Sequence, residues 1–337
     1  MPEKQKRFSL SLLLKLAAGL VLFVLSLWGI QWQQLLDVLK AVNMIWLLLA
    51  LVSMAVSLFI KAYRWLIMLR NYGVEVSLRH VSEAYFVGLV VNLLAPARGG
   101  DIVRLGMLSA YQPATAAQVA ATIALEKFLD LLTLVVISLT VAVYLPPEGT
   151  LWLREWLLPI SSAAVVGLIV VVVFGPGVWQ KIEPDFRRFS QSWVQRGISL
   201  INNFIESSLW LRDKAHLLPI LGLTLLVWFT MWLNNAVLFR GLGMELPVSA
   251  GLLVLVLGYV RMLLALPTGS IGPFYFFAQL SVSTFGVDSE LALVFAILLH
   301  AVVTLTPILV SGGLLLASDE MRRLTQMIWK SNAPETG

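Results

Sequence analysis

Residues 44–69 read MIWLLLALVSMAVSLFIKAYRWLIML. A helix needs about 20 mostly apolar residues to cross a lipid bilayer, and this run is longer. The whole chain has this character, because 59% of its 337 residues are hydrophobic and only 13% are charged. Soluble domains are roughly 45–50% apolar and about 25% charged, so a water-soluble core cannot hold this composition. The apolar runs are also longer than the alternating segments of about 10 residues in membrane β-barrels. We therefore expect an all-α polytopic integral membrane protein.

Other apolar runs of similar length follow along the chain, and two more are interrupted by proline and glycine. Together they predict about six transmembrane helices plus two broken or re-entrant hairpins, in a single membrane domain over residues 1–337. The predicted spans cover residues 10–30, 44–69, 116–145, 156–174, 216–240 and 290–317, and the interrupted segments cover 82–110 and 250–286.

Lysine and arginine gather in alternate loops, which predicts how the chain is oriented. The positive-inside rule places such loops in the cytoplasm, so we expect an inner (plasma) membrane protein with both termini cytoplasmic. Residues 178–214 mix aromatic and charged side chains, as amphipathic helices on a membrane surface do, and we interpret them as a cytoplasmic linker. These topology signals account for the net charge of +5, so no nucleic-acid partner is expected. The cations counted for this side include Lys4, Lys6, Arg7, Arg64, Arg70, Arg79, Lys181, Arg187, Arg188, Lys214, Arg322 and Arg323.

The two halves of the chain match when one is shifted by about 170 residues. Residues 69–75 (LRNYGVE) fall on residues 239–245 (FRGLGME), and a proline followed by a glycine-containing turn comes next in both halves. Each repeat unit then consists of a span, a broken hairpin and a span, over residues 44–145 and 216–317. The charge pattern gives the second and fifth spans opposite directions. We therefore expect an inverted-topology repeat, an arrangement found in many secondary transporters.

A polar turn interrupts the first hairpin at Asn92-Leu-Leu-Ala-Pro96-Ala-Arg98-Gly99-Gly100-Asp101-Ile-Val-Arg104. Lipid offers no hydrogen bonds to backbone that proline and glycine free, so this turn should be buried in protein or line a wet cavity. Asp101 and Arg104 are three residues apart and can pair on one helical face. Backbone N–H groups after Gly100, together with the two arginines, could bind a phosphate group.

A second charged group, Glu126-Lys127-Phe-Leu-Asp130, lies inside the third span. Ionisable groups at membrane depth are costly, and they usually pair with one another or mark a pathway. Lys127 can reach Asp130, whereas Glu126 needs a cation from the hairpin. Two interpretations stay open: an ion-pair network that only fixes the hairpin to the span, or a site whose arginines bind a phosphate headgroup while its carboxylates orient them or carry protons.

The second half offers further polar residues at related positions. Arg261 interrupts an apolar run and should need a partner, whereas a lone histidine such as His300 is more often a hydrogen-bonded packing residue than a proton carrier. The candidate substrate-binding residues from both halves are Asn92, Arg98, Gly99, Gly100, Asp101, Arg104, Glu126, Lys127, Asp130, Arg261, Ser270 and His300.

Several chemistries do not fit the sequence. The absence of cysteine excludes disulfides, zinc–thiolate sites and cysteine nucleophiles. His80, His216 and His300 have no metal-ligand spacing, and there is no P-loop, HExxH or Gly-x-Ser-x-Gly motif. Glu126 and Asp130 form a carboxylate pair, but no nucleophile or metal set accompanies them. We therefore expect neither enzymatic activity nor a cofactor.

The combined motifs, Asn92…Pro96-x-Arg98-Gly99-Gly100-Asp101-x-x-Arg104 with Glu126-Lys127-x-x-Asp130, resemble those of the flippase-like transmembrane domain of the lysylphosphatidylglycerol synthase family. The resemblance covers nearly the whole chain. It implies a protein that binds a lipid with a charged or phosphorylated headgroup and translocates it between leaflets. Because the chain ends soon after its last span, we expect a stand-alone member without the soluble aminoacyl-transferase domain. The alternative is a non-transporting accessory protein that presents a lipid or isoprenoid carrier to a partner synthase or glycosyltransferase.

Overall fold

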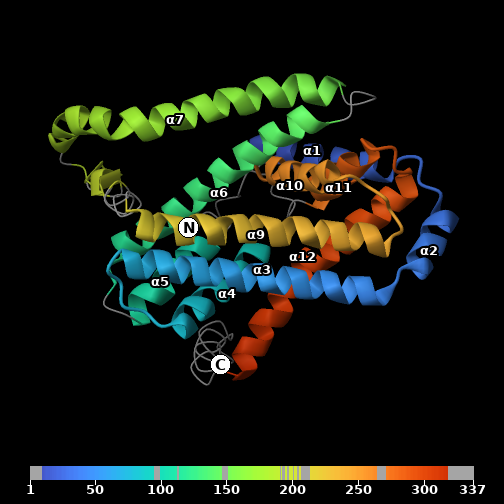
Figure 1. The fold of residues 1–337 in the computed structure, drawn as a ribbon, viewed down its shortest axis with the longest axis horizontal. Coiled ribbons are helices and arrows are strands. Elements are labelled where there is room, and N and C mark those ends of the chain that lie inside the picture. Colours follow the sequence, from blue (N-terminus) through green and yellow to red (C-terminus); the bar gives the residue numbers. More distant parts are fainter. Residues whose placement is uncertain are drawn as a thin grey trace, which may run out of the picture.

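The computed structural model consists of helices, and the described residues contain no strand, so the all-α polytopic membrane fold is confirmed (Figure 1). The described residues are 10–94, 99–111, 114–145, 151–189, 213–263 and 271–317, with short stretches between 191 and 205. The helices are α1 (Leu10–Leu27), α2 (Trp32–Ala41), α3 (Met44–Asn71), α4 (Leu78–Leu94), α5 (Gly100–Tyr111), α6 (Ala116–Tyr144), α7 (Leu151–Arg187), α9 (Lys214–Gly241), α10 (Val248–Leu263), α11 (Ile271–Ser283) and α12 (Ser289–Ala317).

Within the described residues, four helices are long and apolar enough to cross a membrane, namely α3, α6, α9 and α12. The α1–α2 pair is bent by 82° and adds a fifth span if the pair crosses as one. The sequence predicted about six spans. The predicted span 10–30 falls on the bent α1–α2 pair, and the predicted span 156–174 falls on α7. The first of these runs is broken at Gly29, whose φ of 78° is a left-handed conformation that favours glycine.

The helices of the two halves correspond in order and length. α3 and α9 each contain 28 residues, and α6 and α12 each contain 29. Between each pair lies a helical hairpin, formed by helices of 17 and 12 residues (α4 and α5) in the first half and of 16 and 13 residues (α10 and α11) in the second. Each half therefore places a short broken hairpin between two long helices.

α3 and α9 end in the same glycine-containing cap, at the place where their sequences match. Gly73 has a φ of 79° and Gly243 a φ of 68°, the left-handed conformation that glycine adopts most readily. In α3, the N–H of Gly73 donates to the carbonyl of Arg70 at 3.0 Å and that of Val74 to Leu69 at 2.9 Å. This pair of bonds is the Schellman motif. The corresponding bonds of α9 join Gly243 to Arg240 at 3.1 Å and Met244 to Phe239 at 2.8 Å.

α3 and α9 lie side by side and antiparallel (Figure 1). Near the start of α3, the amide of Asn234 donates to the carbonyl oxygen of Ala50 at 2.8 Å. Near its end, the guanidinium of Arg64 donates to the hydroxyl of Thr224 at 3.1 Å. Residue numbers thus rise along one helix as they fall along the other. The two corresponding helices have opposite directions, as an inverted repeat requires.

The α4–α5 hairpin packs against α3 through large side chains. Trp65, Tyr85, Phe86 and Leu108 are all at most 3% exposed and belong to one hydrophobic cluster. Among membrane helices the association comes from close packing rather than from exclusion of water. α5 packs against α4 and α6, and this arrangement brings the charged residues of α5 and α6 together.

Candidate functional site

A buried ion pair joins α5 to α6. The Nη2 atom of Arg104 lies 2.7 Å from Oε2 of Glu126, and its Nη1 atom lies 3.5 Å from Oε1. Both residues are only 3% exposed. Arg104 Nη1 also donates to Asp101 Oδ1 at 3.1 Å, one turn earlier on α5. Buried charges are tolerated when they are paired and hydrogen-bonded in this way. The Asp101–Arg104 pairing was predicted from the spacing, and Arg104 is one of the two hairpin arginines, with Arg98, that were expected to pair with Glu126.

Two aromatic rings hold the other faces of the Arg104 guanidinium. Its central carbon lies 4.0 Å from the ring centre of Trp65 on α3 and 4.8 Å from that of Tyr85 on α4. A guanidinium at these distances is attracted by the negative face of each ring. The Trp65 indole N–H in turn donates to Thr122 on α6 at 3.1 Å. Arg104 is therefore surrounded by protein groups from four helices.

Lys127 lies at the accessible edge of this ion pair. Its Nζ atom is 3.6 Å from both Asp101 Oδ2 and Glu126 Oε1. The side chains of Lys127 and Asp101 are 54% and 37% exposed, far more than that of Glu126. The expected pairing of Lys127 with Asp130 was wrong, because Asp130 pairs with a residue of α3 instead.

That residue is Arg64, which the sequence analysis had counted among the loop cations after the second span. α3 continues to Asn71, so Arg64 lies inside the helix, and its side chain is fully buried. Its Nη1 atom lies 2.8 Å from Asp130 Oδ1 and 3.1 Å from the Thr224 hydroxyl. Arg64 therefore joins α3 to α6 and α9. It was missed because a cation near the end of an apolar run was interpreted as a topology signal.

Lys61 is a second cation of α3 that the sequence analysis did not select. It lies one turn before Arg64 and is half-buried. It is close enough to Asp130, Arg64, Glu126 and Lys127 to interact electrostatically with all of them. We use the term charged cluster for Lys61, Arg64, Asp101, Arg104, Glu126, Lys127 and Asp130.

The polar turn before α5 has a structural role at each described position. Asn92 Oδ1 accepts a hydrogen bond from the backbone N–H of Gly100 at 2.9 Å, which satisfies a free donor at the start of α5. A Cβ atom at Gly100 would collide with the backbone carbonyl oxygen of Gly88 on α4. Gly99 accepts from the N–H of Val103 at 3.0 Å, in the first turn of α5. The predicted Arg98 lies outside the described residues.

In the second half, Arg261 and His300 meet at one aromatic ring. The guanidinium carbon of Arg261 lies 4.4 Å from the ring centre of Phe274, and the His300 ring centre lies 4.7 Å from the same ring. His300 Nδ1 and the Tyr275 hydroxyl are 3.1 Å apart. α10, α11 and α12 therefore bring these predicted residues together. Ser270 lies outside the described residues.

Tyr259 on α10 lies between the two groups of residues. It interacts electrostatically with Asp130 and Arg64 of the charged cluster and also with Arg261, and its ring lies 5.1 Å from that of Trp228 on α9. Over the part of the chain that the structure describes, no three His, Asp or Glu side chains are grouped so that they could hold a metal ion.

Comparison with known proteins agrees with the fold and the motifs. Residues 12–311 match the family described as the lysylphosphatidylglycerol synthase TM region. A UPF0104 membrane protein of Methanothermobacter thermautotrophicus is 24% identical over 255 residues, covering 70% of this chain and 74% of that protein. A UPF0104 membrane protein of Pyrococcus horikoshii is 22% identical over 327 residues, covering 90% of this chain and 96% of that protein. The chain belongs to the family of the lysylphosphatidylglycerol synthase transmembrane region.

Proposed function

We propose that this protein binds a membrane lipid through a charged or phosphorylated headgroup and translocates it between leaflets. The observation that carries the proposal is the charged cluster, which residues of α3, α5 and α6 form; α3 and α6 are long and apolar enough to cross a membrane. Asp130 lies at the middle of α6, and Arg104 and Glu126 lie in the protein interior. Charged groups at such depth are expensive and mark pathways for polar substrates.

The exposure of the cluster residues decreases from its edge to its interior, so a headgroup could enter at the exposed edge. Lys127 and Asp101 are partly exposed at its edge, whereas Arg64 and Glu126 are buried behind them. The acyl chains of the lipid stay in the bilayer, so only the headgroup needs polar contacts along the way. The sequence has no nucleotide-binding motif of its own. We therefore propose movement down a gradient or coupled to an ion, without an enzymatic reaction.

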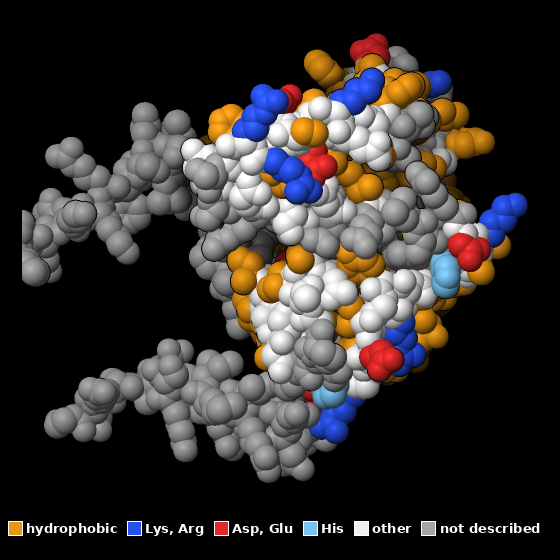
Figure 2. Space-filling model, turned by 90° about the vertical axis from the view of Figure 1, so that its left-hand side faces the viewer, with side chains coloured by type: hydrophobic (Ala, Val, Ile, Leu, Met, Phe, Trp, Pro, Cys, Tyr) orange, Lys and Arg blue, Asp and Glu red, His pale blue; other side chains and the backbone are white. Residues whose placement is uncertain are grey.

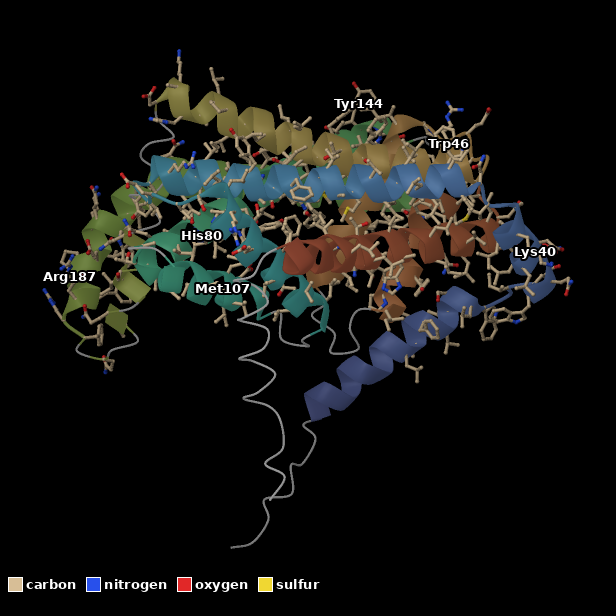
Figure 3. All side chains as sticks on the ribbon, turned by 90° about the horizontal axis from the view of Figure 1, so that it is seen from below. Lys40, Trp46, His80, Met107, Tyr144 and Arg187 are labelled. Atoms are coloured by element: carbon tan, nitrogen blue, oxygen red, sulfur yellow. The ribbon has the colours of Figure 1, made fainter. Side chains whose placement is uncertain are left out.

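The exposed cations support a cytoplasmic assignment for one end of the molecule. Figure 2 shows lysine and arginine side chains around the end at which α3 stops and α9 begins. Figure 3 shows Arg187 at this end and Lys40 at the opposite end. By the positive-inside rule we propose that this end faces the cytoplasm of an inner membrane. The exposed cations near this end are Arg70, Arg79, Lys181, Arg187, Arg188 and Lys214.

A leaflet-exchange assay tests the proposal. Purified protein is placed in vesicles that contain a headgroup-labelled phospholipid, and a membrane-impermeant quencher reports the lipid that reaches the outer leaflet. We expect wild type and Asp37→Asn to accelerate exchange, because Asp37 forms an exposed pair with Lys40 far from the cluster. We expect Asp130→Asn to exchange lipid much more slowly at equal folding. Wild-type rates equal to those of protein-free vesicles would refute translocation.

A non-transporting accessory function remains the second candidate, favoured by the cationic end of α7. Arg187 and Arg188 are 64% and 80% exposed there. Hydrogen bonds from Asn202 and Arg187 lower the pKa of the Glu183 carboxyl, which favours the ionised form that pairs with Arg187. Co-purification of a synthase or glycosyltransferase, lost on neutralising both arginines, would support this function.

A further inference from the structure

We infer that Lys61 and the adjacent N–H groups of Arg64 form an anion-binding subsite on α3, and that its ligand is a phosphodiester headgroup with a single negative charge. This inference rests on the proposed function and assigns the contact that recognises the lipid. Arg104 was predicted from the sequence to bind the headgroup. The inference assigns headgroup binding to Lys61 and Arg64 instead, which were not predicted.

Arg104 has little capacity left for a ligand. Glu126 and Asp101 accept from its terminal nitrogens, and the rings of Trp65 and Tyr85 lie 4.0 and 4.8 Å from its guanidinium carbon. Among the described residues, only the buried Nε atom of this guanidinium lacks an acceptor. Its geometry is that of a group that fixes α5 to α6.

Arg64 differs from Arg104 in the number of its unsatisfied atoms: among the described residues Arg104 lacks an acceptor only at Nε, whereas Arg64 lacks one at two atoms. Its Nη1 atom serves Asp130 and Thr224. Its Nε and Nη2 atoms are buried and have no hydrogen-bond acceptor in the part of the chain that the structure describes. Buried N–H groups without acceptors are unfavourable, so these donors call for an acceptor that the described residues do not supply. Phosphate oxygens accept well from such a guanidinium.

Lys61 supplies the charge for the same ligand. Residues three apart on a helix are neighbours on one face, which places Lys61 beside Arg64. Within the described part of the chain, no carboxylate lies within 4.0 Å of its ammonium. It is nevertheless half-buried in a segment that crosses the membrane. An ammonium at this depth needs a counter-charge.

The charge balance of the cluster limits what that ligand can be. The cluster has four cations, Lys61, Arg64, Arg104 and Lys127, and three carboxylates. Every carboxylate contacts an arginine or Lys127, which leaves the charge of Lys61 as the surplus. One phosphodiester cancels this surplus. A phosphomonoester, at about −1.5 to −2 near pH 7, would exceed it.

Binding measurements on purified full-length protein test the inference. The probes are phosphatidylglycerol (a phosphodiester), phosphatidic acid (a phosphomonoester) and diacylglycerol (uncharged), measured by native mass spectrometry. The variants are Lys61→Met, Lys61→Arg, and Lys40→Met as a control on α2, where Lys40 is 74% exposed. We expect phosphatidylglycerol to bind best, Lys61→Met to weaken it by about tenfold or more, and the other two variants to stay within about threefold of wild type.

Equal binding by wild type and Lys61→Met, or equal binding of diacylglycerol and phosphatidylglycerol, would overturn the inference. Competition by inorganic phosphate distinguishes a site for lipid from a site for free anions. We expect it to compete weakly, and full displacement of the lipid at equal concentration would overturn the lipid assignment. Failure of the proposed function gives a different result, since Lys61-dependent binding would persist in vesicles that show no leaflet exchange.

Discussion

At the scale of the residue, the cations of the charged cluster differ in their partners. Some form close ion pairs with carboxylates, and Lys61 forms none among the described residues. Arg104 contacts two carboxylates and two aromatic rings. Lys61 has no such partners among the described residues, although it lies within electrostatic reach of Asp130. Arg104 therefore has a structural role, whereas the positive charge of Lys61 is available to a ligand. Stability measurements should distinguish these roles without any knowledge of the substrate.

Neutralising Glu126 tests the structural role of Arg104. Glu126→Gln leaves a buried guanidinium beside a neutral amide, and removing one partner of a buried pair typically costs about 3–5 kcal/mol. We expect a large fall in the thermal midpoint of the purified protein in detergent, followed by intrinsic fluorescence. Asp37→Asn breaks an exposed pair with Lys40, which is worth at most about 1 kcal/mol. Equal shifts for the two variants would contradict the structural role.

Neutralising Lys61 should have the opposite effect on stability. Lys61→Met removes a half-buried charge that lacks a close counter-ion, so we expect the thermal midpoint to stay the same or rise. Arg64→Met strands the Asp130 carboxylate, 2.8 Å away in the wild type, and should lower the midpoint. The comparison is made on lipid-free protein in detergent. A lower midpoint for Lys61→Met than for Arg64→Met would show that Lys61 is the structural cation.

At the scale of the element, the site depends on how closely α4 and α5 approach each other. The backbone of Gly100 faces the carbonyl oxygen of Gly88, and Asn92 binds the Gly100 N–H. Small residues allow membrane helices to come this close. Packing thus explains the glycine at position 100, whereas nothing lies within 4 Å of a Cβ position at Gly99. The role predicted from the sequence, a helix start that binds phosphate through its backbone N–H groups, stays a prediction.

Adding one methyl group to Gly100 tests this close approach. In Gly100→Ala the new Cβ meets the backbone of α4, which cannot move aside as a side chain could, so the hairpin must open. We expect a lower thermal midpoint and slower lipid exchange. Gly106→Ala on the same helix is the matched control, because nothing lies within 4 Å of its Cβ position. In a helix interior that change is expected to stabilise by roughly 0.5–1 kcal/mol.

The elements also show how much could be predicted from the sequence. Apolar runs gave the four long helices, since hydropathy reports membrane spans directly. The local cap at Gly73 was visible as a repeated motif, and the spacing of Asp101 and Arg104 gave their pairing. The Arg64–Asp130 pair joins helices far apart in sequence, and no local pattern specifies it. The bend between α1 and α2 likewise left fewer continuous spans than the hydropathy suggested.

At the scale of the whole molecule, the antiparallel α3 and α9 give the chain two distinct ends. α2 and the start of α3 lie at one end, and the last turns of α7 lie at the other (Figure 3). The exposed cations around the second end support its cytoplasmic assignment. The charged cluster lies closer to that end, because Arg64 is nearer to the last residue of α3 than to the first. A headgroup from the cytoplasmic leaflet would therefore reach it by the shorter route.

Single-cysteine labelling tests this arrangement, and the chain suits it because it contains no cysteine. We expect Lys40→Cys on α2 to react with a membrane-impermeant maleimide from outside intact cells, because that end lies opposite the cationic one. Lys181→Cys on α7 should react only in inverted membrane vesicles. Both positions are exposed, so failure to react reports the side of the membrane rather than burial. Labelling of both variants from the same side would contradict the two-ended arrangement, and with it the path proposed for the headgroup.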